Sequence, residues 1–228
     1  MKYFNENIGE YPWKQYSIIQ GGDGGMEYPM ATLLKGAGPD LVIHEWMHSW
    51  YQGMIATNES LYAWMDEGFT SYVENRIMEE VFGLDRAVME QALSTQDLNA
   101  ELKELPEGDT ILHVEIEGRD PDDAFSGVPY TKGQLFLIFL EEKFGRDKFD
   151  PFVKTYFNDH AFQSIDTESF VKYLNKNLIS KYPGIVTMEQ INSWIYEPQL
   201  PSYAPQPTSD VFVKVQTNMD NWLADKSS

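Results

Sequence analysis

Short runs of β-favouring residues occupy the first 35 positions of the chain, and longer helical segments follow. Residues 14–20 (KQYSIIQ) and 30–34 (MATLL) are two such runs, and each is long enough for a strand. The glycine-rich stretch 21–25 (GGDGG) lies between them. The pattern therefore predicts a small N-terminal sheet with a loop of exposed backbone between its strands.

Glycine and proline divide the rest of the chain into helices. Pro39 suits the first position of a helix that ends near Gly53, and a second helix is expected over residues 61–82. Thr187 and Gln190 have the spacing of a capping box. Further helices are predicted over residues 85–105, 130–144, 149–158, 167–178, 188–196 and 209–224.

Two segments interrupt the helical pattern. Residues 106–129 are predicted to be mostly loop with a short strand at 111–114, and residues 198–207 hold four prolines, which favours an extended linker. We therefore predict a main domain over residues 1–200, followed at 201–228 by a linker and the start of a truncated helical region. The expected fold class is α/β (α+β), mostly helical with a small N-terminal sheet.

Composition limits the partners that the chain can bind. Its 36 acidic and 17 basic residues give a net charge of -19, which disfavours nucleic acid and anionic membranes. The absence of cysteine excludes disulfides, thiolate ligands and a cysteine nucleophile. The longest apolar run, residues 135–140, is much shorter than the roughly 20 residues that span a bilayer. We expect a monomer, and the compartment stays open.

The sequence His44-Glu45-Trp46-Met47-His48 is the strongest chemical signal in the chain. Histidines four positions apart lie on one helix face, about 40° apart around the axis, so both imidazoles can reach one metal ion. Glu45 flanks that position without having to bind the metal, which suits a general base acting on the attacking water. The alternative interpretation is two ordinary surface histidines.

Glu67 is the expected third ligand. Eighteen residues lie between His48 and Glu67, which allows the second helix to return beside the first. Glu67 stands among Trp64, Met65 and Phe69, and an unpaired carboxylate among apolar groups is costly. Two histidines, a glutamate and an open position predict one Zn²⁺ ion, which polarises the scissile carbonyl and lowers the pKa of its bound water. The predicted reaction is peptide hydrolysis without a covalent intermediate.

These motifs resemble those of the gluzincin peptidases. Residues 24–28 (GGMEY) resemble the exopeptidase signature of peptidase family M1, and residues 128–133 (VPYTKG) resemble the segment that holds the family's catalytic tyrosine. The segments DPD at 120–122 and WIYEP at 194–198 look closest to the leukotriene-A hydrolase branch. The similarity extends from about residue 16 to residue 201, and it implies a thermolysin-like zincin catalytic domain.

The resemblance also implies roles for single residues. Glu27 falls on the family's glutamate that anchors the free α-ammonium of the substrate, and Gly24, Gly25 and Met26 accompany it in the substrate-binding signature. Tyr130 falls on the tyrosine that donates to the oxyanion of the tetrahedral intermediate. The implied partners are peptides with free N-termini, because an internal peptide would leave Glu27 unpaired.

Other positions extend or depart from the family pattern. Asp122 matches an acid near the substrate pocket of the leukotriene branch, and Asp66 stands where the family usually has asparagine. The hypothesis for Asp66 is that it accepts a hydrogen bond from a ligand histidine. The family's N-terminal β-domain is missing and its C-terminal helical domain is represented only by residues 209–228, so a fragment of a larger aminopeptidase is expected. An inactive or weakly active zinc- and peptide-binding fragment, an endopeptidase and an epoxide hydrolase remain alternatives.

Overall fold

The computed structural model describes residues 2–22 and 24–226, and a three-stranded sheet lies in its N-terminal part. The strand order is β1-β3-β2. β1 (Ser17–Gln20) runs parallel to β3 (Ala31–Leu34), and β2 (Gly25–Met26) pairs antiparallel with β3. The two predicted strands are confirmed, and the glycine-rich loop contributes a third, short strand at the sheet edge.

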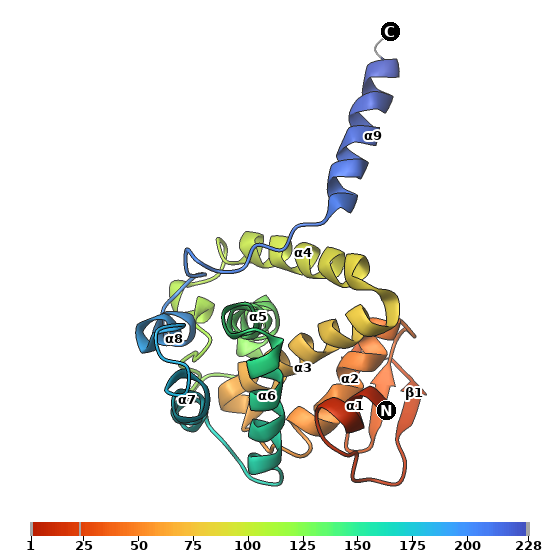
Figure 1. Ribbon diagram of the computed structural model, residues 1–228. Coiled ribbons are helices and arrows are strands. Elements are labelled where there is room, and N and C mark those ends of the chain that lie inside the picture. Colours follow the sequence, from red (N-terminus) through yellow and green to blue (C-terminus); the bar gives the residue numbers. More distant parts are fainter. Residues whose placement is uncertain (1, 23, 227–228) are drawn as a thin grey trace.

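Two long helices carry the metal motif. α2 (Pro39–Tyr51) begins at the predicted proline, and α3 (Glu59–Phe82) returns alongside it. α2 also packs against β2 and β3, so the edge of the sheet lies beside the helix that carries the two histidines (Figure 1). Gly83 ends α3 with a φ of 93°, a conformation that favours glycine, and α4 (Leu84–Glu101) then packs on α3.

Helices from the second half of the chain enclose the other side of α3 (Figure 1). The predicted capping box is present, since the Gln190 amide N–H donates to Thr187 Oγ1 over 3.2 Å. π-helical turns lie at Val128–Lys132, where the sequence predicted a loop up to residue 129 and α-helix from residue 130, and at Asn175–Ile179, at the end of the helix predicted over 167–178. The enclosing helices are α5 (Gly133–Phe144), α6 (Arg146–His160), α7 (Thr167–Leu174) and α8 (Met188–Tyr196).

The backbones of α3 and α5 approach each other at a pair of glycines. A Cβ placed on Gly68 would lie 2.9 Å from the Cα of Gly133 and 3.2 Å from the carbonyl oxygen of Pro129. Large aromatic side chains fill the core around this crossing, and among them Trp64 and Phe136 are fully buried. The close crossing places the turn that precedes α5 directly beside the part of α3 that carries Glu67.

The predicted strand at residues 111–114 is wrong. The segment between α4 and α5 contains 3₁₀ turns at Glu107–Thr110 and Pro121–Ala124, and residues 111–114 form bends and irregular backbone. The His113 amide donates to the Ile195 carbonyl over 3.0 Å, so this backbone pairs with the end of α8 instead of with a strand. The structure also has a short helix that was not predicted, α1 (Lys2–Asn7).

The chain is mostly helical with a small N-terminal sheet, the α/β (α+β) class expected from its sequence. The last helix, α9 (Asp210–Lys226), extends away from the helical body beyond α4 (Figure 1). The proline-rich segment before it begins against that body, since the Gln199 amide donates to Thr110 Oγ1 over 3.0 Å. Within residues 2–22 and 24–226, no helix combines the length and apolar content needed to cross a bilayer.

Candidate metal centre

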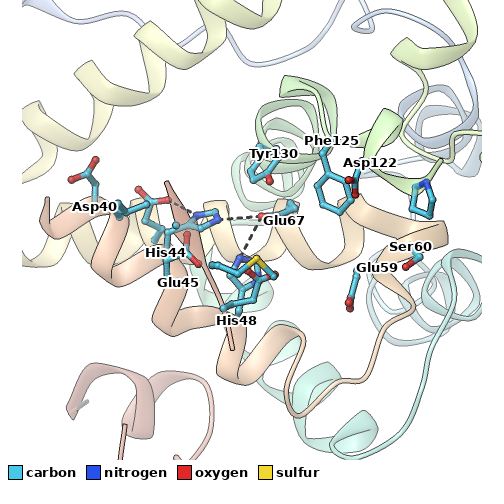
Figure 2. Close-up of a pocket in the computed structure, with 16 residues that line it drawn as sticks. Asp40, His44, Glu45, His48, Glu59, Ser60, Glu67, Asp122, Phe125 and Tyr130 are labelled. Atoms are coloured by element: carbon cyan, nitrogen blue, oxygen red, sulfur yellow. Dashed lines mark hydrogen bonds and ion pairs between the residues drawn. The ribbon is translucent and has the colours of Figure 1, made fainter. Parts of the chain in front are cut away.

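His44, His48 and Glu67 meet where α2 and α3 lie side by side. Oε2 of Glu67 lies 3.1 Å from Nε2 of His44 and 3.4 Å from Nε2 of His48. The two imidazole rings are 4.9 Å apart between centroids, and all three donor atoms lie within 4.8 Å of one another. Figure 2 shows the Glu67 carboxylate directed between the two histidines. The structure therefore brings the three predicted ligands together.

This donor set fits a zinc ion. In a tetrahedral site with bonds of about 2.0–2.1 Å, neighbouring donor atoms are roughly 3.3 Å apart, close to the two separations observed here. Although burial alone raises the pKa of Glu67, its hydrogen bonds to His44 and His48 lower it to about 2, so the carboxylate is ionised. Two imidazoles and one carboxylate leave a fourth position for water or substrate, as in catalytic zinc sites.

A carboxylate holds the outer nitrogen of each ligand histidine. Asp66 Oδ1 lies 2.6 Å from Nδ1 of His48, and Glu74 Oε2 lies 3.0 Å from Nδ1 of His44. These contacts fix the ring orientations and direct both Nε2 atoms toward Glu67. Asp66 has the arrangement hypothesised from the sequence, whereas Glu74 was not identified. Its position seven residues after Glu67, two turns along the same face of α3, was the available signal.

Glu45 lies at the floor of the site with one oxygen unengaged. Its side chain is buried, and Oε2 has no hydrogen-bond partner in the described part of the chain. Burial raises the pKa of Glu45 to about 7, and the neighbouring His44 and His48 act in the opposite direction. A carboxyl group with a pKa near neutrality can both accept and release a proton, which suits a general base.

Tyr130 faces the ligands from the π-helical turn Val128–Lys132. Its ring stacks on His44, with centroids 5.9 Å apart and planes inclined by 25°. Burial raises the pKa of Tyr130 above its usual value, and the nearby carboxylate of Glu67 raises it further. The phenol therefore keeps its proton at neutral pH and can donate a hydrogen bond (Figure 2).

Except for the buried Asp66, all of these side chains line one cleft of about 710 Å³. Of the residues implied by the family resemblance, Gly25, Met26, Glu27 and Asp122 line this cleft, whereas Gly24 does not belong to its lining. A carboxylate oxygen of Glu27 lies within 4.8 Å of donor atoms of His48, Asp66 and Glu67. Further lining residues were not identified from the sequence, and they include Asp40, Leu41, Glu59, Ser60 and Phe125.

The fold and this donor set define the catalytic domain of a metallopeptidase. The peptidase family M1 domain matches residues 34–194, and the chain belongs to peptidase family M1. The match includes the metal motif and the tyrosine turn, while the glycine-rich residues before β3 precede it.

Proteins similar to this chain include two aminopeptidases and an LTA4 hydrolase. Leucine aminopeptidase 2 of Ajellomyces capsulatus is 32% identical over 92% of this chain and 36% of its own length. Aminopeptidase B of Mus musculus is 34% identical over 87% of this chain and 33% of its own length. The structure of native yeast LTA4 hydrolase superimposes with a TM-score of 0.85 at 29% identity, covering 98% of this chain and 38% of that one. The chain thus spans about a third of the length of these relatives.

Proposed function

We propose that the chain is the catalytic domain of a zinc aminopeptidase that removes N-terminal residues from peptides. We assign this domain to residues 1–200, and residues 201–228 to a linker and the start of a further helical region. The observation that carries the proposal is the buried Glu45 carboxylate, which has a free oxygen beside the three metal donors. The names of the relatives, leucine aminopeptidase 2 and aminopeptidase B, agree with it.

The chemistry divides between the ion and the protein. Zinc, when bound, polarises the scissile carbonyl and acidifies a water molecule. Glu45 accepts a proton from the attacking water and passes it to the leaving nitrogen, for which its pKa of about 7 is suited. The protonated phenol of Tyr130 donates to the carbonyl oxygen as negative charge develops there.

We assign to Glu27 the preference for substrate peptides that have a free N-terminus. Its half-buried carboxylate lines the cleft close to Asp66 and Glu67, so negative charge is concentrated at this end of the site. A free α-ammonium group placed there forms a charge-assisted hydrogen bond with Glu27. An N-acetylated peptide has no such charge and leaves the carboxylate desolvated without a partner, which disfavours its binding.

Turnover and metal content, measured together on Glu45→Gln, test the proposal. The variant is expected to keep one zinc per chain and to lose hydrolysis of aminoacyl anilides by about 10²-fold or more. Because the relatives are about three times longer, both quantities are measured on this chain alone and on a longer chain in which it replaces the matching segment of aminopeptidase B. Equal turnover of Glu45→Gln and wild type in the active chain contradicts the base role. Zinc and peptide binding without turnover in either chain favours a binding fragment.

Free and N-acetylated forms of one peptide test the exopeptidase part. Wild type is expected to cleave only the free form at an appreciable rate, and Glu27→Gln is expected to raise KM for it by about tenfold or more. Asp40→Asn is the matched control, because Asp40 lines the same cleft on α2 outside the ligand cluster. Cleavage of both peptide forms at equal rates would show an endopeptidase.

A further inference from the structure

Lys132 is a fully buried lysine two residues after Tyr130. Its exposed fraction is 0%, and it is among the largest side chains that are completely enclosed. The ammonium donates to the carbonyl oxygen of Thr110 over 2.8 Å and to that of Glu197 over 3.0 Å. No acidic side chain in the described residues forms an ion pair with it.

Burial of this ammonium is unfavourable by itself. Removal from water lowers the pKa of Lys132 to about 7, and the Glu197 carboxylate opposes that shift. An apolar side chain of similar length would fill the same volume without the desolvation cost. Packing alone therefore does not account for a lysine here, and its two hydrogen bonds are what an apolar side chain cannot supply.

Those hydrogen bonds join three segments that are distant in the sequence. Thr110 ends the 3₁₀ turn after α4, Glu197 follows α8, and Lys132 ends the π-helical turn that carries Tyr130. The start of that turn is tied independently, since the Gly127 amide donates to Glu101 Oε2 over 2.9 Å. π-helical turns are rare and occur frequently at functional sites.

The side chains of Tyr130 and Lys132 point to opposite sides of the turn. Tyr130 lines the cleft and stacks on His44, whereas Lys132 is enclosed in the body of the domain. Figure 2 shows the Tyr130 ring above the ligand cluster. The phenol and the Lys132 nitrogen therefore lie on opposite sides of one five-residue turn.

We propose that Lys132 is a positioning residue, whose side-chain nitrogen donates to the carbonyls of Thr110 and Glu197 and thereby holds the phenol of Tyr130 at the metal centre. The proposal rests on the role assigned to Tyr130 in the proposed function. It also links the site to the backbone that follows α8, because that backbone supplies one of the two acceptors.

A double-mutant cycle on kcat tests this link. Lys132→Met in the wild-type background is expected to lower kcat about 10- to 100-fold with KM changed less than about twofold, because a small displacement of a catalytic group has effects of this size. In the Tyr130→Phe background the same substitution is expected to change kcat less than about twofold. Lys154→Met is the control, since Lys154 also donates to a distant backbone carbonyl, that of Glu6, far from the cleft. Equal losses of kcat in both backgrounds overturn the proposal.

A second measurement needs no turnover and separates this proposal from the function itself. The chain is labelled with 3-fluorotyrosine, and the ¹⁹F resonance of Tyr130 is identified by its loss in Tyr130→Phe. Lys132→Met is expected to shift or broaden that resonance, while Lys154→Met leaves it unchanged. An unchanged resonance in Lys132→Met overturns the proposal even if the enzyme is active. A shifted resonance supports the proposal that the hydrogen bonds of Lys132 position Tyr130, even if the chain hydrolyses no peptide.

A chemical rescue covers the case in which Lys132→Met does not fold. The chain has no cysteine, so Lys132→Cys can be alkylated at one position in the unfolded state and then refolded. Aminoethylation restores an ammonium at the position of the lysine nitrogen and is expected to restore the Tyr130 resonance. Alkylation with a neutral propyl group is expected not to restore it. Equal resonances for both adducts overturn the proposal.

Discussion

The backbone of Gly25 lies against the carboxylate of Glu45. A Cβ at position 25 would overlap Oε1 of Glu45 and would also crowd the side chain of Leu41 at 2.9 Å. Gly25 belongs to β2 and Glu45 to α2, so the contact occurs where the edge of the sheet meets the metal-binding helix. The absence of a side chain at Gly25 thus leaves room for the carboxylate of Glu45, the proposed base.

Gly25→Ala is therefore expected to displace the Glu45 carboxylate. Because neither histidine is touched, zinc content should stay at the wild-type value, while kcat/KM for an aminoacyl anilide falls about 10- to 100-fold. Gly22→Ala is the matched control, since a Cβ at position 22 meets nothing within 4 Å and this glycine belongs to the same glycine-rich stretch, residues 21–25. Wild-type kcat/KM in Gly25→Ala would show that Glu45 does not need its observed position.

The sequence was sufficient to predict that His44, His48 and Glu67 meet, because helical periodicity determines their placement. Histidines four apart on a helix share a face, and the helix containing Glu67 returns antiparallel to it across a short connection. The spacing of Glu74, two turns after Glu67, placed it on the same face of α3 but did not by itself identify His44 as its partner. The π-helical turn at Tyr130 was likewise missed, because the contacts at its ends, from Lys132 to Thr110 and from Gly127 to Glu101, join residues that are distant in the sequence. Residues 111–114 were predicted as a strand because local pattern does not show which backbone they pair with. The His113 amide pairs with the carbonyl at the end of α8.

Glu74→Gln is expected to weaken zinc binding. The Glu74 carboxylate fixes the orientation of the His44 ring and increases the basicity of that imidazole, and the substitution removes it. Losses of such partners cost about 10- to 100-fold in metal affinity. Competition with a chromophoric chelator measures the dissociation constant. Glu80→Gln, an exposed position on the same helix, is the control and should bind zinc as wild type does. Identical affinities for Glu74→Gln and the control would mean that the contact does not support the ligand.

Gly68→Ala is expected to destabilise the fold at the crossing of α3 and α5. The added Cβ meets backbone atoms of Gly133 and Pro129, which cannot move aside as a side chain can, so a loss of about 1–3 kcal/mol in the free energy of unfolding is expected. Urea unfolding of the metal-free proteins measures it without a contribution from zinc. Gly108→Ala, where a Cβ meets nothing within 4 Å, should change the stability little. A stable Gly68→Ala variant would show that the two helices can separate without cost.

The buried Lys132 should make stability depend on pH in the alkaline range. Its pKa is lowered from 10.5 to about 7 in the folded chain, so between these values the unfolded state binds a proton that the folded state does not. The free energy of unfolding therefore rises with pH in this window, with a slope that approaches about 1.4 kcal/mol per pH unit for one proton. Unfolding in urea at several pH values between 7.5 and 9.5 is compared for metal-free wild type and Lys132→Met. The stability of wild type relative to the variant should increase with pH, because titrations common to both proteins cancel in the difference. A difference that stays constant over this range would mean that Lys132 keeps its ordinary pKa when it is buried.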